Sequence, residues 1–175
     1  SGSKVQLVNM LKYFAADNDV KIVLFIRKEN LNLLDGLDRS KFKLVIIRIG
    51  AIHTVVRVIW EQTFLPLMLL REKTDVLFCP GNIAPIFSPV KTVQWIGTIG
   101  PFFGEFCKGF GFYDRVVLFF NKILMIFSAR RSDIVIHESK FSKNIFCDRY
   151  DCCISRSEVI HIGKDEYFHP VPDDK

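Results

Sequence analysis

Short apolar runs alternate with longer amphipathic segments along this chain. The apolar runs are rich in β-branched and aromatic residues, and their apolar positions are mostly continuous rather than alternating with polar ones. Such runs are typical of strands buried on both faces, which occur mainly in parallel sheets covered by helices. The pattern predicts strands at residues 20–26, 42–48, 75–79, 91–96, 133–137 and 158–162.

Between these runs, four segments have the features of helices. Pro66 should kink or divide the second of them, and Ser139 should cap the fourth. The regular alternation of strand and helix predicts an α/β fold: a doubly wound, mainly parallel, Rossmann-like sheet with helices on both faces. The predicted helices span residues 4–17, 53–73, 113–131 and 140–150.

The chain enters its first predicted helix at once, whereas a doubly wound sheet normally begins with a strand that becomes its centre. Residues 1–3, Ser-Gly-Ser, are either an expression scar or the glycine-bearing turn after a strand that is absent from this chain. We favour the turn, because six strands without a central one would leave a gap or unpaired edges. A continuous sheet built from the six predicted strands would contradict this expectation.

Composition and charge narrow the possible partners. The 175 residues suit one domain, and 17 Phe are a heavy aromatic load that must be buried, bound to lipid or docked on another domain. A net charge of +5 favours anionic partners. No Lys/Arg run exceeds two residues, and basic residues do not alternate with aromatic ones, so we expect no nucleic-acid partner.

The five cysteines and the longest apolar segment argue against a disulfide-stabilised, a zinc-binding and a membrane-spanning protein. An odd number of Cys without C-x-x-C spacing makes a disulfide framework or a zinc site improbable and fits free thiols in a reducing cytosol. The apolar segment 116–129 is interrupted by Asn121 and Lys122 and is too short for a membrane span. We therefore expect a cytoplasmic protein without a transmembrane helix.

Candidate chemistry follows the predicted strands, because ligands of such sheets bind beyond the carboxyl ends of the strands. Gly81 and Asn82 follow the 75–79 strand, Gly97 and Thr98 follow the 91–96 strand, and Ser139 follows the 133–137 strand. Ordinary turn and capping chemistry explains each of these residues equally well when it is taken alone. No dinucleotide-binding, P-loop, nucleophile-elbow or zinc-protease motif is present.

Three segments in order resemble the amino-terminal half of group 1 glycosyltransferases of the GT-B fold. The first two are "DVLFCPGNIAPIFSPVKTVQWIGTIGPF" and "SARRSDIVIHESKFSKNIF". The third is "VIHIGKDEYFHPV", in which Gly163, Asp165, Phe168 and Pro170 match the linker between the two Rossmann-like domains. The resemblance implies an acceptor-side domain at 1–162 and the start of the linker at 163–175, with the donor-binding domain outside this chain.

The resemblance also implies an activity. It is the transfer of a sugar, with retention, from a nucleotide-sugar donor to a hydroxyl of a glycan or lipid-linked acceptor, without cofactor or essential metal. Residues 1–175 alone should be inactive. The implied substrate-binding residues are Gly2, beside the donor diphosphate, and Gly81, Asn82, Gly97, Thr98 and Ser139.

The sequence departs from the family at one strand tip. Gly97 and Thr98 stand where many members have His-Asp, so no catalytic residue is assigned. Two alternatives remain open: a nucleotide-sugar epimerase with the same fold, and a non-catalytic module that binds a membrane or a protein.

A glycine-rich aromatic loop predicts a membrane or acceptor contact. Its aromatic side chains would insert shallowly on the inner face of a membrane while its lysine meets anionic headgroups. Alternatively, the rings cover the core or another domain. The residues concerned are Phe102, Phe103, Phe106, Lys108 and Phe110.

Overall fold

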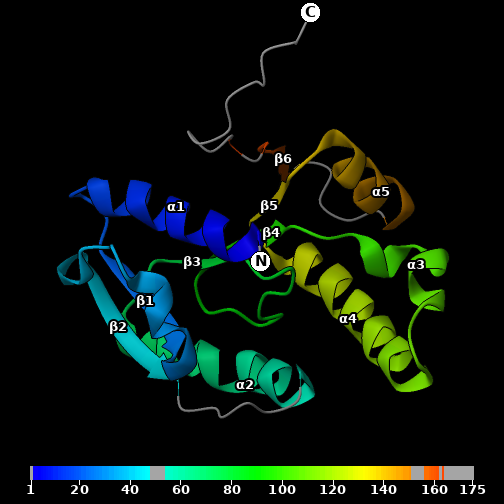
Figure 1. Ribbon diagram of the computed structural model, residues 1–175, viewed down its shortest axis with the longest axis horizontal. Helices are drawn as coiled ribbons and strands as arrows, with labels where there is room; N and C mark the ends of the chain where they lie inside the picture. Colours follow the sequence, from blue (N-terminus) through cyan, green and yellow to red (C-terminus); the bar gives the residue numbers. More distant parts are fainter. Residues whose placement is uncertain (1, 48–53, 151–155, 162, 164–175) are drawn as a thin grey trace, which may run out of the picture.

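The computed structural model describes residues 2–47, 54–150, 156–161 and 163. Within them the chain alternates helices with short strands (Figure 1). The elements are α1 (Gly2–Ala16), β1 (Ile22–Arg27), η1 (Lys28–Leu34), η2 (Arg39–Lys41), β2 (Phe42–Ile47), α2 (Thr54–Glu72), β3 (Val76–Cys79), β4 (Lys91–Ile96), η3 (Gly100–Phe102), α3 (Gly104–Lys108), α4 (Phe112–Arg131), β5 (Ile134–His137), α5 (Lys140–Tyr150) and β6 (Ser157–Val159).

All six predicted strands and all four predicted helices are present, with ends that differ from the prediction by a few residues. Pro66 does not divide α2, which is assigned as one helix from Thr54 to Glu72 with the proline inside it. The prediction missed the short helices η1, η2, η3 and α3, because segments of three to seven residues carry too little periodicity to be recognised.

The strands form two sheets, and every pair in them is parallel. β1 pairs with β2, and a second sheet has the order β3-β4-β5-β6. The mixed α/β fold with parallel strands confirms the predicted Rossmann-like class. The six strands do not make one continuous sheet.

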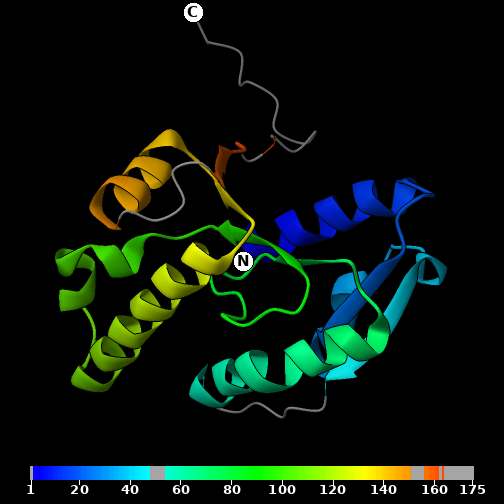
Figure 2. The same cartoon turned by 180° about the vertical axis from the view of Figure 1, so that it is seen from behind.

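Helices cover both faces of the four-stranded sheet. Leu77 and Cys79 of β3 pack against α2, and Val135 of β5 packs between α4 and α5. On the opposite face, Phe78 of β3 meets Phe14 of α1 edge to face at 6.1 Å. In Figures 1 and 2, α1 and α2 therefore appear on opposite sides of β1 and β3.

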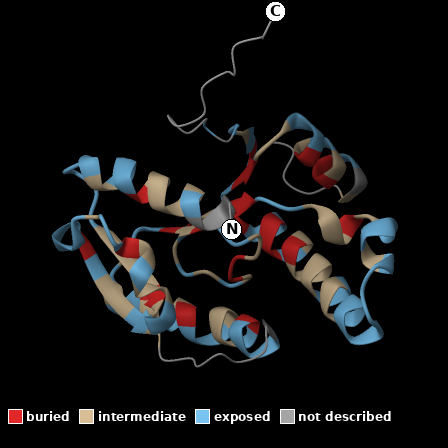
Figure 3. Cartoon of the chain, viewed as in Figure 1, coloured by how far each residue is buried: buried red, intermediate tan, exposed pale blue. Residues whose placement is uncertain are grey.

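The most completely buried part of the molecule is the side of the four-stranded sheet that faces α4 and α5. Its cluster joins β4 and β5 to both helices, and Figure 3 shows buried residues gathered on these elements. The members are Ile96, Phe102, Met125, Ala129, Val135 and Phe146.

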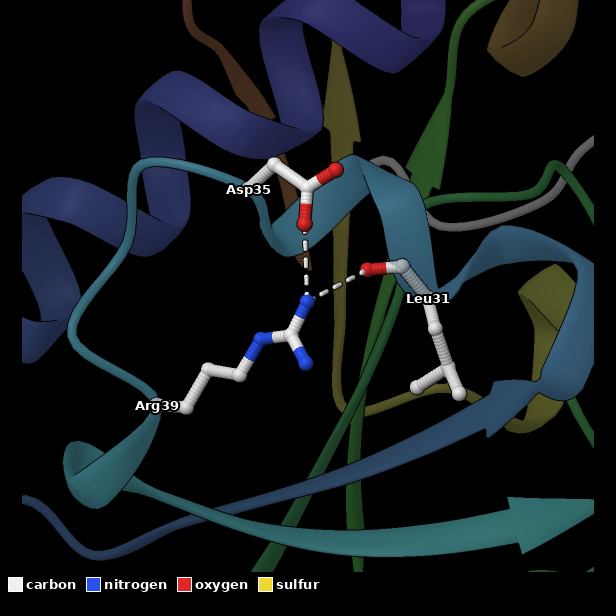
Figure 4. Close-up of polar contacts among 3 residues, drawn as sticks. All are labelled: Leu31, Asp35 and Arg39. Atoms are coloured by element: carbon white, nitrogen blue, oxygen red, sulfur yellow. Dashed lines mark hydrogen bonds and ion pairs between the residues drawn. The ribbon is translucent and has the colours of Figure 1, made fainter.

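The connection between β1 and β2 is a compact turn held at the surface (Figure 4). Arg39 donates to Asp35 at 2.8 Å and to the carbonyl of Leu31 at 3.5 Å. Asp38 begins η2 by accepting from both the backbone N–H and the hydroxyl of Ser40, and these hydrogen bonds hold the pKa of Asp38 below its usual value. These polar contacts hold the connection between β1 and β2 in one conformation.

Candidate functional site

The carboxyl ends of β3 and β4 are joined by the side chain of Asn82. Asn82 adopts a left-handed backbone conformation with φ 67°, which asparagine tolerates better than most residues. Its Oδ1 accepts from the backbone N–H of Gly97 at 2.8 Å and of Thr98 at 3.1 Å. The structure thus brings together three of the predicted site residues, and the backbone N–H groups of Gly97 and Thr98 are satisfied by Asn82.

A buried polar network supports the backbone of Asn82. Gln94, which is fully buried in β4, donates to the carbonyl of Asn82 and to the hydroxyl of Ser128. It also accepts from the hydroxyl of Ser132 at 3.0 Å. Buried amides are retained in cores when all their polar atoms are paired, and such networks make a local conformation rigid. The turn after β3 is therefore fixed to α4.

Glu138 is the acidic residue at this edge that sequence reasoning missed. Its Oε1 accepts from the indole of Trp95 at 3.0 Å, and a Cβ built at Gly97 would lie 3.0 Å from the same oxygen. Glu138 thus fills the space that a side chain at position 97 would enter. Its position directly after a strand was a usable signal, because the turns after parallel strands meet at one edge of a sheet.

Ser139 and His137 have structural partners. The hydroxyl of Ser139 accepts from the N–H of Ser142 at 3.1 Å, which confirms the predicted cap of α5. His137 is fully buried, with Nδ1 3.4 Å from the hydroxyl of Ser142 and its ring 5.6 Å from that of Phe146. Ser139 therefore lies beside Glu138 with its oxygen engaged by the helix.

The remaining predicted glycines differ in their surroundings. Gly81 is open, with nothing within 4 Å of a Cβ built on it. Gly2, predicted to lie in the turn ahead of a helix that begins at residue 4, is instead the first residue of α1. Gly163 is exposed, whereas Asp165, Phe168 and Pro170 lie outside the described residues.

The aromatic loop divides into a buried and an exposed part. Phe102 is only 5% exposed and packs against Phe146 and Tyr150, so the expectation that it faces a membrane is corrected to a role in the core. Its removal from water follows from η3, which turns it toward α5. Phe103 is half-buried and stacks on Phe141 at 6.3 Å.

Phe106, Lys108 and Phe110 are exposed, and α4, which follows them in the chain, carries further exposed apolar side chains. The rings of Phe106 and Phe110 lie 5.2 Å apart. We define the aromatic surface as the exposed side chains of Phe106, Phe110, Phe112, Tyr113, Val116, Phe119 and Phe120. Large exposed apolar patches usually mark an interface.

A cavity lies away from these turns. It has a volume of about 450 Å³ and is lined by Leu67 and Leu70 of α2, Phe87, and Thr92 and Asp133 at the amino ends of β4 and β5. It is therefore on the edge of the sheet opposite Asn82 and Glu138. We place the candidate site at the carboxyl edge, because the polar side chains gather there.

The described residues hold no metal-ligand cluster and no membrane-spanning helix. Within that part of the chain, no three His, Cys, Asp or Glu side chains are grouped closely enough to hold a metal ion. No described helix combines the length and the apolar character needed to span a membrane.

Comparison with known proteins adds no relatives. No protein-family model, no curated protein and no solved structure matches this chain.

Proposed function

We propose that residues 1–175 form the acceptor-side domain of a glycosyltransferase. In the intact protein a sugar would pass, with retention, from a nucleotide-sugar donor to a hydroxyl of a glycan or lipid-linked acceptor. The single observation that carries the proposal is the polar edge formed by Asn82, Thr98 and Glu138 on a Rossmann-like sheet. Two of the three sequence segments that resemble GT-B glycosyltransferases contain these residues.

The chemistry of this edge suits a hydroxylated ligand. The carboxylate of Glu138 accepts hydrogen bonds, and the exposed Thr98 carries a hydroxyl whose oxygen already accepts from the N–H of Gly100 at 3.3 Å. Carboxylates and hydroxyls of this kind orient sugar hydroxyls. We assign Glu138 and Thr98 to the acceptor and leave the donor diphosphate to backbone amides and to cations of a second domain.

Glu138 also explains how this domain can lack the histidine that many family members carry. Because its carboxylate lies where a side chain at position 97 would extend, a histidine there would displace it. In the proposal, Glu138 takes over the orientation of the acceptor from the missing imidazole. No role for it as a nucleophile is required.

The test uses the full-length protein that the natural gene encodes. Radiolabelled UDP-glucose, UDP-N-acetylglucosamine and GDP-mannose are each incubated with it and a glycolipid extract, and transfer is followed by chromatography. We expect transfer from one donor, and a loss of roughly tenfold or more in kcat/KM for Glu138→Gln. Asp75→Asn is the matched control, because Asp75 is an exposed carboxylate directly ahead of β3, at the opposite edge of the sheet.

Two results would count against the proposal. Equal kcat/KM for Glu138→Gln and Asp75→Asn would remove Glu138 from the acceptor site. No transfer and no donor hydrolysis by a folded intact protein would remove the transferase itself. A product that is an epimerised nucleotide sugar would instead support the epimerase alternative.

The aromatic surface favours a second candidate function, a module that binds anionic membranes. Phe112 is 85% exposed and Phe119 59% exposed, while Lys108 and Arg115 are exposed near them. Aromatic rings that insert shallowly and cations that meet lipid phosphates act together in peripheral binding. This function is compatible with the transferase, whose acceptor would then be lipid-linked.

Flotation with phosphatidylcholine vesicles tests this function. The vesicles are used with and without roughly 30% phosphatidylserine, which supplies the anionic charge. Phe112→Ser/Phe119→Ser should abolish flotation with the anionic vesicles. Phe87→Ser is the control, since Phe87 is 76% exposed but lies near Arg131 at the other edge. A protein that stays at the bottom with both vesicle types is not a membrane binder.

A further inference from the structure

One face of β1 and one face of β3 are covered by the same helix, although the two strands belong to different sheets. Leu11 of α1 packs in one cluster with Ile26 of β1. Phe14, one turn further along α1, meets Phe78 of β3. α1 therefore extends over both strands.

The other helix that covers both strands is α2. Leu65 and Leu69 of α2 pack in one cluster with Leu77 of β3, and Phe25 of β1 packs against that cluster. Since neighbouring residues of a strand point to opposite faces, Phe25 and Ile26 place β1 between α2 and α1. Leu77 and Phe78 do the same for β3. The two strands thus lie in one layer, between α1 on one side and α2 on the other.

The strands nevertheless do not pair with each other. In the described part of the chain, β1 is paired only with β2, and β3 only with β4. Each strand therefore has one edge without ladder hydrogen bonds, and these edges lie between α1 and α2. Unpaired backbone N–H and C=O groups in such a place are costly, and native sheets pair or cover them.

Burial follows the pairing. In β4 and β5, which have a neighbour on each side, most residues are buried, whereas in β1 only Ile26 is buried and Val76 of β3 is 53% exposed (Figure 3). A cavity of about 250 Å³ lies beside β1, between α1 and α2. Its lining includes Leu7, Phe25 and Trp60. The space beside β1 is thus incompletely filled, and its lining is mainly apolar, with Arg27, Asn30, Arg57 and Glu61 as its polar members.

The helices that connect successive strands indicate what occupies the space between β1 and β3. α2 leads from β2 to β3, α4 from β4 to β5, and α5 from β5 to β6, whereas α1 leads into β1 from no described strand. In a doubly wound sheet of order 3-2-1-4-5-6, the first strand lies between the second and the fourth. The observed order β2-β1 and β3-β4-β5-β6 reproduces that arrangement with its first strand absent.

We propose that polypeptide directly preceding this chain in the protein forms a further parallel strand between β1 and β3. This strand, here called strand X, would join the two sheets in the order β2-β1-X-β3-β4-β5-β6 and lead into α1 at Gly2. It is apolar on both faces, because α1 and α2 cover it. Its carboxyl end adjoins that of β3, at the point where the strand order reverses. Ligands of such sheets bind in the crevice at that point.

Amide hydrogen exchange tests strand X without any reference to sugar transfer, so the proposal stands or falls separately from the proposed function. Two forms are compared: residues 1–175, and the same chain extended by the residues that its gene encodes ahead of it. In the extended form, amides of β1 and β3 should exchange roughly tenfold or more slowly, since an edge becomes a paired strand. Amides of β6 serve as the internal control.

A proline variant covers the case in which residues 1–175 fail to fold alone. Two alternate residues of the added apolar run are replaced by Pro in the extended form, which removes ladder donors. Exchange of β1 and β3 should then return to the fast rate while β6 stays protected. Unchanged exchange at β1 and β3 in either comparison, or a gene without an apolar run of roughly four to eight residues there, would overturn the proposal.

Discussion

The indole Nε1 of Trp95 donates a hydrogen bond to Oε1 of Glu138 at 3.0 Å. This bond joins β4 to the residue that follows β5, and it holds the carboxylate against the backbone of Gly97. The parallel register that places Ile96 opposite His137 brings these two strand ends to the same level. The candidate acceptor site therefore depends on a tertiary pairing of residues 43 positions apart.

Replacement of Gly97 should disturb Glu138. A Cβ at position 97 would lie 3.0 Å from the carboxylate, so Gly97→Ala should move it away from Trp95 and lower the free energy of unfolding by about 1 kcal/mol, the usual value of one hydrogen bond. Gly81→Ala is the matched control, with a change near zero. The indole N–H resonance of Trp95, followed by NMR, reports the bond directly. An unshifted resonance in Gly97→Ala would contradict this geometry.

Asn82 should show two separable effects. Asn82→Gly keeps the left-handed conformation but removes the acceptor for two backbone N–H groups, and we expect a loss of about 1 kcal/mol. Asn82→Ala adds the cost of a positive φ, for a total of about 2 kcal/mol. Urea unfolding measures both values. If Ala proved as stable as Gly at this position, the conformation of Asn82 would not be left-handed in solution.

Gln94 and Ser132 should be energetically coupled. Both are buried, and the hydroxyl of Ser132 donates to Oε1 of Gln94 at 3.0 Å. Gln94→Met should cost about 2 kcal/mol, because it leaves buried polar partners unsatisfied. A double-mutant cycle with Ser132→Ala should give a coupling of about 1 kcal/mol. Strictly additive effects would show that the network does not act as a unit.

Cys79 should make stability dependent on alkaline pH. Burial, and secondarily the negative charge of Glu61, raises the pKa of Cys79 from 9.0 to about 12. Above pH 9 the unfolded chain releases the thiol proton while the folded chain keeps it, so the free energy of unfolding falls between pH 9 and 12. The slope is at most about 1.4 kcal/mol per pH unit. Cys79→Ala should remove this component, as measured by urea unfolding at several pH values.

Much of the fold was predictable because its signals are local. Continuous apolar runs predicted every strand. Ser139 was predicted as a helix cap, and the hydrogen bond from the N–H of Ser142 confirms it. Pro66 was predicted to kink or divide its helix, and division is contradicted, since α2 continues through the proline as one helix. Tertiary packing of Leu65 and Leu69 against β3 and Ala84 holds the two sides of the proline in the same element.

The candidate site was only partly predictable. Asn82, Gly97 and Thr98 were recognised as turn residues after strands, and the structure joins them through hydrogen bonds. Glu138 was missed, because its proximity to Gly97 depends on the pairing of β4 with β5. Phe102 was assigned to the wrong side of its loop, since nothing local distinguishes a buried ring from an exposed one.

The amino-acid sequence by itself determined the elements, their order and the parallel α/β class, because propensity and periodicity are properties of neighbouring residues. Only the tertiary structure decided that Glu138 lies against Gly97, that Gln94 supports Asn82, and that the gap expected in the sheet lies between β1 and β3. These relationships arise from contacts between residues far apart in the chain. Their energies depend on which strand lies beside which, and local sequence carries no record of that.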